Sequence, residues 1–173
     1  MDYALSGLPH IETERLHLRP LRLSDAEAFR TMTDEPAILG AVHFLVRPFE
    51  LANAEKLIVG DDDGRDCFWG AWSRGDPTLL GTVGTHLSGA EEIEVGYWFA
   101  IAAQGRGLAS EAVKGILPVL ANTYPQRRIV AECRPQNQAS WRLLERVGFR
   151  ADGADGSRPG RRRLIFGLVA APE

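Results

Sequence analysis

The sequence predicts an α/β fold in which helices cover both faces of a mixed, mostly antiparallel central sheet. Strand-like and helix-like periodicities follow one another in the order β-α-α-β-β-β-α-β-α-β. The three consecutive strands are joined by short turns, which makes them an antiparallel meander. A glycine-rich turn at residues 104–109 then leads into a long helical pattern. Because helices and sheets bury their apolar faces against each other, these elements indicate a sandwich around one sheet.

Composition limits the class of protein. The 173 residues, 45% hydrophobic and 25% charged, suit one globular domain over residues 1–173, and we expect residues 1–12 to form a flexible leader. A net charge of −3 gives no general drive towards nucleic acid or anionic membranes. No apolar run approaches the length of a membrane span, and the N-terminus lacks the apolar region of a signal peptide, so we expect a cytoplasmic protein. The two cysteines, Cys67 and Cys133, and the four histidines do not have the spacing of metal ligands. We therefore expect two reduced thiols and no bound metal ion.

The N-terminal third is expected to contain one strand and two helices. Alternating apolar residues predict a strand over Arg15–Leu21. Ser24–Glu27 reads as a capping box, which places a helix from Asp25 to about Thr33, ended by the Asp34-Glu35-Pro36 segment. Pro48 suits the first turn of a second helix.

The remaining elements are expected as an ordered series: strands Cys67–Ser73, Leu79–Leu87 and Glu92–Phe99, a helix from about Gly107 to Asn122, a strand Arg128–Cys133, a helix from Asn137 to Gly148 and a last strand Arg161–Val169. Pro118 should kink the first of these helices or end it early. The Gly153–Gly160 segment reads as a glycine-rich loop.

The turn Gln104-Gly105-Arg106-Gly107-Leu108-Ala109 predicts a phosphate site. A strand, a glycine turn and a helix N-terminus gather free backbone N–H groups around one point, where the helix dipole also favours an anion. A turn that merely permits close packing is the alternative. A dinucleotide-binding module is disfavoured, because Ser110 stands where a third glycine belongs and the expected acidic partner is missing.

With these motifs in view, the chain resembles the GNAT superfamily of N-acetyltransferases. Gln104, Gly107 and Ala109 match its Arg/Gln-x-x-Gly-x-Gly/Ala signature in register. Several segments resemble the branch that acetylates the N-termini of ribosomal proteins: Thr13–Leu21, Glu94–Trp98, Gly107–Ala112 and Asn137–Phe149. The resemblance implies acetyl-CoA as co-substrate.

The resemblance also implies which residues bind the cofactor. Backbone N–H groups from Gln104 to Ala109, with Ser110 beside them, would hold the pyrophosphate. The main chain near Phe99 and Ile101 would pair with pantetheine amides, and Asn137 would bond the pantetheine arm, although it also reads as a helix N-cap. Arg106 and Arg146 would meet phosphate oxygens or simply face solvent.

Two residues are the implied catalysts. Many superfamily members carry a tyrosine acid where this chain has Leu144, and in the resembling branch a serine takes that role, here Ser140. A first-turn serine bonded to backbone is its alternative reading. Glu94 is the candidate general base, directly or through water; a solvated carboxylate beside Glu92 is the alternative.

The resulting hypothesis is an acetyl-CoA-dependent N-acetyltransferase that acts on a protein N-terminus or a small-molecule amine. Antibiotic or polyamine acetylation and a non-catalytic acyl-CoA-binding regulatory domain remain alternatives. We expect the acceptor site under residues 34–49 and the Gly153–Gly160 loop, with Trp69, Trp72 and Trp98 as lining or core residues. A dense positive cluster, defined by Arg158, Arg161, Arg162 and Arg163, would attract an acidic peptide or ribosomal RNA, or protect a strand edge. A homodimer is plausible from the resemblance.

Overall fold

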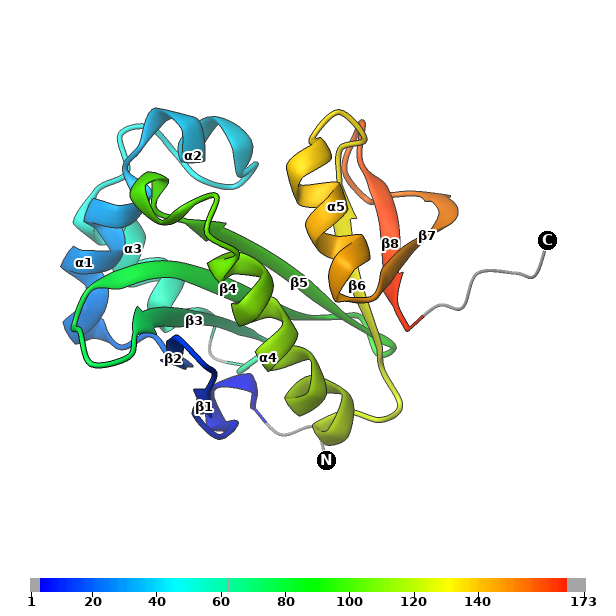
Figure 1. Ribbon diagram of the computed structural model, residues 1–173, viewed down its shortest axis with the longest axis horizontal. Helices are drawn as coiled ribbons and strands as arrows, with labels where there is room; N and C mark the ends of the chain where they lie inside the picture. Colours follow the sequence, from blue (N-terminus) through cyan, green and yellow to red (C-terminus); the bar gives the residue numbers. More distant parts are fainter. Residues whose placement is uncertain (1–3, 62, 168–173) are drawn as a thin grey trace.

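The computed structural model describes residues 4–61 and 63–167 of the chain. Its strands form one sheet in the order β1-β2-β3-β4-β5-β6-β8-β7 (Figure 1). All neighbouring strands are antiparallel except β5 and β6. The strands are β1 (Ile11–Glu12), β2 (Leu16–Pro20), β3 (Asp66–Ser73), β4 (Leu79–Ser88), β5 (Glu92–Phe99), β6 (Arg128–Cys133), β7 (Phe149–Asp155) and β8 (Arg162–Phe166). The expected mixed, mostly antiparallel sheet is confirmed.

Helices cover both faces of this sheet. The α-helices are α1 (Ala26–Thr33), α2 (Pro36–Ala41), α3 (Leu51–Val59), α4 (Leu108–Thr123) and α5 (Gln138–Val147), and short 3₁₀ turns are η1 (Leu5–Gly7), η2 (Leu23–Asp25) and η3 (Ile101–Ala103). Side chains alternate along β3: Trp69 packs with α4 and α5, whereas Phe68 packs with α1, α2 and α3. This period of two is what gives one sheet two separate cores.

The sheet opens between β5 and β6. These parallel strands pair only where Glu92–Glu94 of β5 meets Arg128–Val130 of β6. Beyond Glu94, no described strand lies against this edge of β5, and Figure 1 shows the two strands diverging, with α4 over β5 and α5 over β6. The opening therefore leaves the backbone of residues 95–99 free to pair with another extended molecule.

The expected strand over 15–21, the three-strand meander, the strand over 128–133 and the helices from 107 and 137 are all present within a residue or two of their predicted bounds. The expected flexible leader needs correction over its described part. Leu5 is fully buried and Ile11 is nearly so, and Ile11 pairs with Leu18 of β2. These apolar side chains complete the core beneath α4, which holds the segment in place. Residues 1–3 lie outside the described part.

Several local predictions differ from the structure. Pro48 lies before α3 rather than in its first turn, because the helix begins at Leu51. Asp25, rather than Ser24, is the N-cap residue of α1, and its side chain stabilises the preceding turn η2 instead of the helix. Its carboxylate accepts bonds from the Arg22 backbone N–H and the Arg19 guanidinium, both at 2.8 Å. Pro36 ends α1 as predicted but also starts α2, because proline suits the first helical position. The Gly153–Gly160 loop begins later than expected, since β7 continues to Asp155. The expected end of the last strand, Val169, lies outside the described residues.

Pro118 neither shortens nor ends α4, which continues to Thr123. A proline at this position removes the N–H that would bond to the carbonyl of Lys114. Both Lys114 and Pro118 are exposed. Water can therefore satisfy the freed carbonyl, and the helix continues.

Candidate active site

One cavity of about 1020 Å³ follows the opening between β5 and β6 and continues under α2 and α3. One end is lined by the glycine turn and by the first turns of α4 and α5. The other end is lined by polar side chains of β3, β4, β5 and β6, by α2 and by the turn before β8. A single cavity thus connects the predicted cofactor side with the predicted acceptor side.

The glycine turn has the backbone of an anion site. Gly105 has φ +74° and Gly107 has φ +75°, in the left-handed region that favours glycine. Gly107 caps α4, and its carbonyl accepts the Glu111 N–H at 3.1 Å. The N–H groups that precede Glu111 in the first turn have no intrahelical acceptor, so they and the helix dipole can meet an anion.

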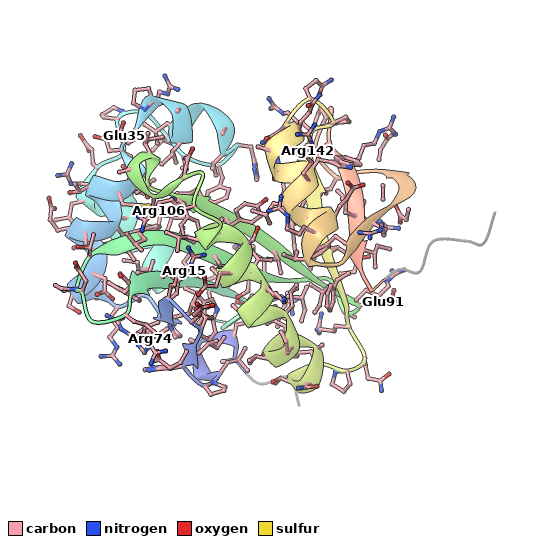
Figure 2. The ribbon with its side chains drawn as sticks, viewed as in Figure 1. Arg15, Glu35, Arg74, Glu91, Arg106 and Arg142 are labelled. Carbon is pink, nitrogen blue, oxygen red and sulfur yellow. The ribbon has the colours of Figure 1, made fainter. Side chains whose placement is uncertain are left out.

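Arg15, at the start of β2, holds this turn in place. Its Nη1 donates to the Arg106 carbonyl at 2.9 Å, and its Nε donates to Glu111 Oε2 at 2.7 Å. Figure 2 shows Arg15 and Arg106 beside the first turns of α4. Thr13 Oγ1 donates to the other Glu111 oxygen at 2.6 Å. Burial alone would raise the pKa of Glu111, but these hydrogen bonds and the charge of Arg15 lower it below its ordinary value.

Ser110 and Asn137 lie on the first turns of facing helices and both line the cavity. Arg146 Nη1 donates to Ser110 Oγ at 3.4 Å, so this guanidinium lies over the start of α4. Asn137 caps α5: its Oδ1 accepts the Ser140 N–H at 3.2 Å. The cap uses the side-chain oxygen and leaves the Asn137 amide donors for a ligand.

Ser140 forms a hydroxyl pair that the sequence did not predict. Its Oγ lies 2.7 Å from Tyr97 Oη, which comes from β5 on the opposite side of the opening. Burial raises the pKa of Tyr97 to about 12, so its phenol stays protonated at neutral pH. Burial also raises the pKa of the nearby Cys133 thiol, while a hydrogen bond with Ser140 partly lowers it. The site therefore contains neighbouring neutral proton donors where an acid catalyst is expected.

Glu94 faces the acceptor side, where it is tied to an arginine rather than freely solvated. Its Oε1 accepts from Arg158 Nη1 at 2.6 Å. The same Nη1 reaches Glu132 Oε2 at 3.0 Å, and Ser157 Oγ bonds the other Glu132 oxygen at 2.7 Å. Within the described part of the chain, the second Glu94 oxygen, Oε2, accepts no such bond and is left for a ligand proton.

His86 adds a second basic group to this face, also unpredicted. It lies directly across from Glu94 in the register of β4 and β5, and its Nδ1 is 2.7 Å from Asp66 Oδ1. If Nδ1 carries the proton, Nε2 is left with a lone pair. A Cβ on Gly84 would come within 2.9 Å of Nε2, so glycine at that position provides the space for the ring. The sequence could have identified His86 as a site residue, because the short turn between β4 and β5 fixes their register and places His86 opposite Glu94.

Most of the predicted site residues come together along the cavity: Glu94, Phe99, Gln104, Gly105, Gly107, Leu108, Ala109, Ser110, Asn137 and Ser140 all line it. Arg106 does not line it, and Ile101 lies in η3 with 47% of its surface exposed. Gln104 Nε2 donates to the Phe99 carbonyl at 3.1 Å, so that carbonyl keeps only one lone pair for a ligand. Of the three tryptophans considered, Trp98 lines the cavity, whereas Trp69 and Trp72 are core residues.

The described residues contain no group of three or more His, Cys, Asp or Glu side chains placed to hold a metal ion. Over the same part of the chain, no helix has the length and apolar character needed to cross a membrane.

An open strand edge, a glycine turn at the start of a helix and a polar face across the opening fit a group-transfer enzyme, with a phosphorylated cofactor on one side of the opening and an acceptor on the other. The sequence matches the acetyltransferase (GNAT) domain over residues 15–150. The chain therefore belongs to the GNAT family and is an N-acetyltransferase. Acetyltransferases of this family use acetyl-CoA.

Known relatives agree with this assignment. The chain is 28% identical over 146 residues to the uncharacterized N-acetyltransferase YnaD of Bacillus subtilis, a match that covers 83% of this chain and 84% of YnaD. Its fold resembles a GNAT-family acetyltransferase from Bacillus anthracis with a TM-score of 0.79 and 22% identity, over 91% of this chain and 98% of the other. It also resembles RimL, a ribosomal-protein alpha-N-acetyltransferase solved with coenzyme A, with a TM-score of 0.78 and 18% identity, over 92% and 99% of the two chains.

Proposed function

We propose that this protein transfers the acetyl group of acetyl-CoA to a primary amine, a protein N-terminal α-amine or the amine of a small molecule, by direct attack of that amine. The observation that carries the proposal is the continuous cavity from the glycine turn, past Ser140, to the Glu94 face. It provides one surface for a phosphorylated cofactor and another for an acceptor.

The residues present fit acetyl-CoA. The left-handed glycines and the first turn of α4 offer N–H donors to a pyrophosphate, with Arg146 beside them. The unpaired edge of β5 offers backbone groups to the pantetheine amides, and Asn137 offers its amide donors. When bound, acetyl-CoA supplies an activated thioester to the opening.

The reaction needs two proton transfers, one from the attacking amine and one to the leaving thiolate, and each can be carried out by groups on one side of the opening. Only a neutral amine attacks; an α-amino group, with a reference pKa of about 8, needs less help from a base than a lysine side chain at about 10.4. Glu94 Oε2, or His86 Nε2 held by Asp66, can accept the amine proton on the acceptor face. Ser140 Oγ, supported by Tyr97 Oη, can donate a proton to the departing thiolate.

The two candidate bases can be distinguished by paired variants. Glu94→Gln and His86→Gln each remove a proton acceptor while retaining most of the side-chain volume. We expect the variant that lacks the base to lose tenfold or more in kcat, in line with general-base contributions of about 100-fold or more, with the loss largest below the pKa of the acceptor amine. A pH–rate profile of each variant gives this measurement, and equal small effects would leave water as the proton acceptor.

The first test is calorimetric titration with acetyl-CoA, with NADH and ATP as controls. We expect micromolar binding of acetyl-CoA, on the scale of about −8 kcal/mol, and no comparable binding of the controls. CoA release with a panel of peptides and small-molecule amines then identifies which class of acceptor the enzyme uses. Absence of acetyl-CoA binding would return the glycine turn to a purely structural role.

A further inference from the structure

The positive cluster separates into paired and unpaired members. Arg158 is bonded to Glu94 and Glu132, Arg162 is paired with Asp155, and Arg163 is paired with Asp152. Arg161 has no carboxylate within ion-pair distance among the described residues. Its guanidinium donates only to two backbone carbonyls, Glu132 O at 3.5 Å and Ala41 O at 3.3 Å.

Arg161 is nevertheless half-buried and lines the cavity described above. It lines the acceptor side together with Arg158, His43 and Glu94. The turn before β8 brings the two arginines together, since the Arg161 N–H donates to the Arg158 carbonyl at 3.2 Å. Figure 1 shows α2, which carries Ala41, and this turn at the same end of the molecule. The guanidinium thus bridges two walls of the cavity.

The electrostatic surroundings of Arg161 are positive. Burial lowers the pKa of Arg161, and the charges of Arg134 and Arg158 lower it further. Burial, followed by the charges of Arg158 and Arg161, also lowers the pKa of His43. Glu132 is the carboxylate whose charge acts on Arg161, and it already accepts bonds from Ser157 and Arg158 on its two oxygens. A partly buried cation in such surroundings is stabilised by an added anion.

We propose that Arg161 binds an anionic group, a carboxylate or a phosphate, carried by the amine acceptor. This inference rests on the proposed acetyl transfer, because it assigns a substrate class to the same cavity. The acceptor is then a molecule with an amine at one end, directed to the Glu94 side of the opening, and an anion at the other. A polyamine or a polycationic antibiotic lacks such a group and would leave Arg161 without an anionic partner.

The test uses acceptors that share an amine and differ only in the anion. One pair is the tripeptide amides Ser-Ala-Glu and Ser-Ala-Gln; the other is phosphoethanolamine and ethanolamine. We expect the anionic member of at least one pair to have a kcat/KM tenfold or more higher, mostly through KM, because arginine binds these oxyanions bidentately. A preference confined to the peptide pair indicates a peptide carboxylate, and one confined to the second pair indicates a small phosphorylated amine.

Arg161→Gln is the decisive variant, and Arg162→Gln is its matched control on the adjacent residue, whose arginine is paired with Asp155. Arg161→Gln should bring the anionic and neutral acceptors to equal kcat/KM, whereas Arg162→Gln should keep the wild-type preference. Acetyl-CoA affinity should be the same in both variants and the wild type. Equal use of both members of each pair by the wild type, or a loss of acetyl-CoA affinity in Arg161→Gln, would overturn the assignment.

A binding measurement keeps this test independent of turnover. In calorimetry with the CoA-bound protein, the N-acetylated Glu peptide should bind at least about tenfold more tightly than the N-acetylated Gln peptide, and Arg161→Gln should abolish that difference. If acetyl-CoA itself does not bind, the proposed function fails, yet the same peptide pair still tests the anion site on the free protein. The same comparison is made with N-acetylated phosphoethanolamine and N-acetylethanolamine. Equal binding of the anionic and neutral members in both pairs, or no binding of any of the four, contradicts the inference.

Discussion

At the scale of single residues, the proposed acid side of the site is a pair of hydroxyls from different elements. Tyr97 comes from β5 and Ser140 from α5, and their oxygens are 2.7 Å apart across the opening. Asn137 orients the backbone of Ser140 through the helix cap. We therefore propose that Tyr97 is a positioning residue that orients the Ser140 hydroxyl.

Substitution of Ser140 by alanine should lower kcat tenfold or more, because it removes the proposed proton donor to the leaving thiolate. Tyr97→Phe should lower kcat by a smaller factor, since the serine hydroxyl remains but loses its orienting partner. Acetyl-CoA affinity should be close to the wild-type value in both variants. Single-turnover kinetics and calorimetry measure the two quantities, with Ser24→Ala, on an exposed serine of η2, as the control.

An unchanged kcat in Ser140→Ala would contradict the acid role. A change in acetyl-CoA affinity equal to the change in kcat would instead assign the hydroxyl to cofactor binding.

Single residues also show what the sequence could and could not predict. The proposed cofactor-binding residues from Gln104 to Ser110 are contiguous, so one motif predicted them, and most of them line the cavity. Tyr97 and His86 each belong to the site through a partner on another element, Ser140 and Asp66. A linear motif carries no information about such pairs, although strand register would have placed His86 opposite Glu94.

At the scale of elements, the start of α4 depends on the segment before β2. Arg15 bonds both the Arg106 carbonyl in the turn and the Glu111 carboxylate in the first helical turn. The turn is thus held in one conformation before any ligand arrives. Preorganisation of this kind reduces the entropy lost on binding.

Arg15→Ala should therefore weaken acetyl-CoA binding by about three- to tenfold with little effect on the kcat of the loaded enzyme, because the loop must be ordered at the moment of binding. Arg74→Ala is the matched control: Arg74 also bonds the same N-terminal segment, through the Thr13 carbonyl at 3.0 Å, but makes no contact with the turn. Calorimetric Kd values of the three proteins decide the point. Equal weakening in both variants would show a general effect on the segment instead.

The elements were predicted well where periodicity was strong and less well where tertiary packing decided. The meander and the two C-terminal helices follow regular patterns and were located within a residue or two. The segment at 5–12 has no such pattern, yet Leu5 and Ile11 fill the core under α4. Helix α2 is only six residues long, too short for a clear period, and begins at a proline that also reads as a stop.

At the scale of the whole molecule, one sheet separates two cores and supports the site at its opening. The core with α4 and α5 surrounds Trp69, and the core with α1, α2 and α3 surrounds Phe29. Tyr97 and Cys67 lie on the same side as Trp69, and both carry ionisable groups in buried, neutral form. The stability of the fold is therefore coupled to pH at alkaline values.

Burial, and secondarily the Asp66 carboxylate, raises the pKa of Cys67 from 9.0 to about 12. Burial raises the pKa of Tyr97 from 10.0 to about 12. Because both folded values exceed the unfolded ones, their contribution to stability is complete below about pH 9 and is lost as the pH rises towards 12. A tenfold difference in an acid dissociation constant corresponds to about 1.4 kcal/mol, so the free energy of unfolding should fall by a few kcal/mol over this range.

Urea unfolding between pH 8 and about 11 in the presence of a reductant tests this coupling. The wild-type free energy of unfolding should decline steadily above about pH 9, and Cys67→Ala should flatten the curve between about pH 9 and 10, where only the thiol of the unfolded chain ionises. Tyr97→Phe should flatten it only above about pH 10, because phenol ionisation begins later. The two variants should therefore depart from the wild-type curve of unfolding free energy against pH at different pH values. If both variants give curves parallel to the wild type, neither buried group controls the stability of the fold at alkaline pH.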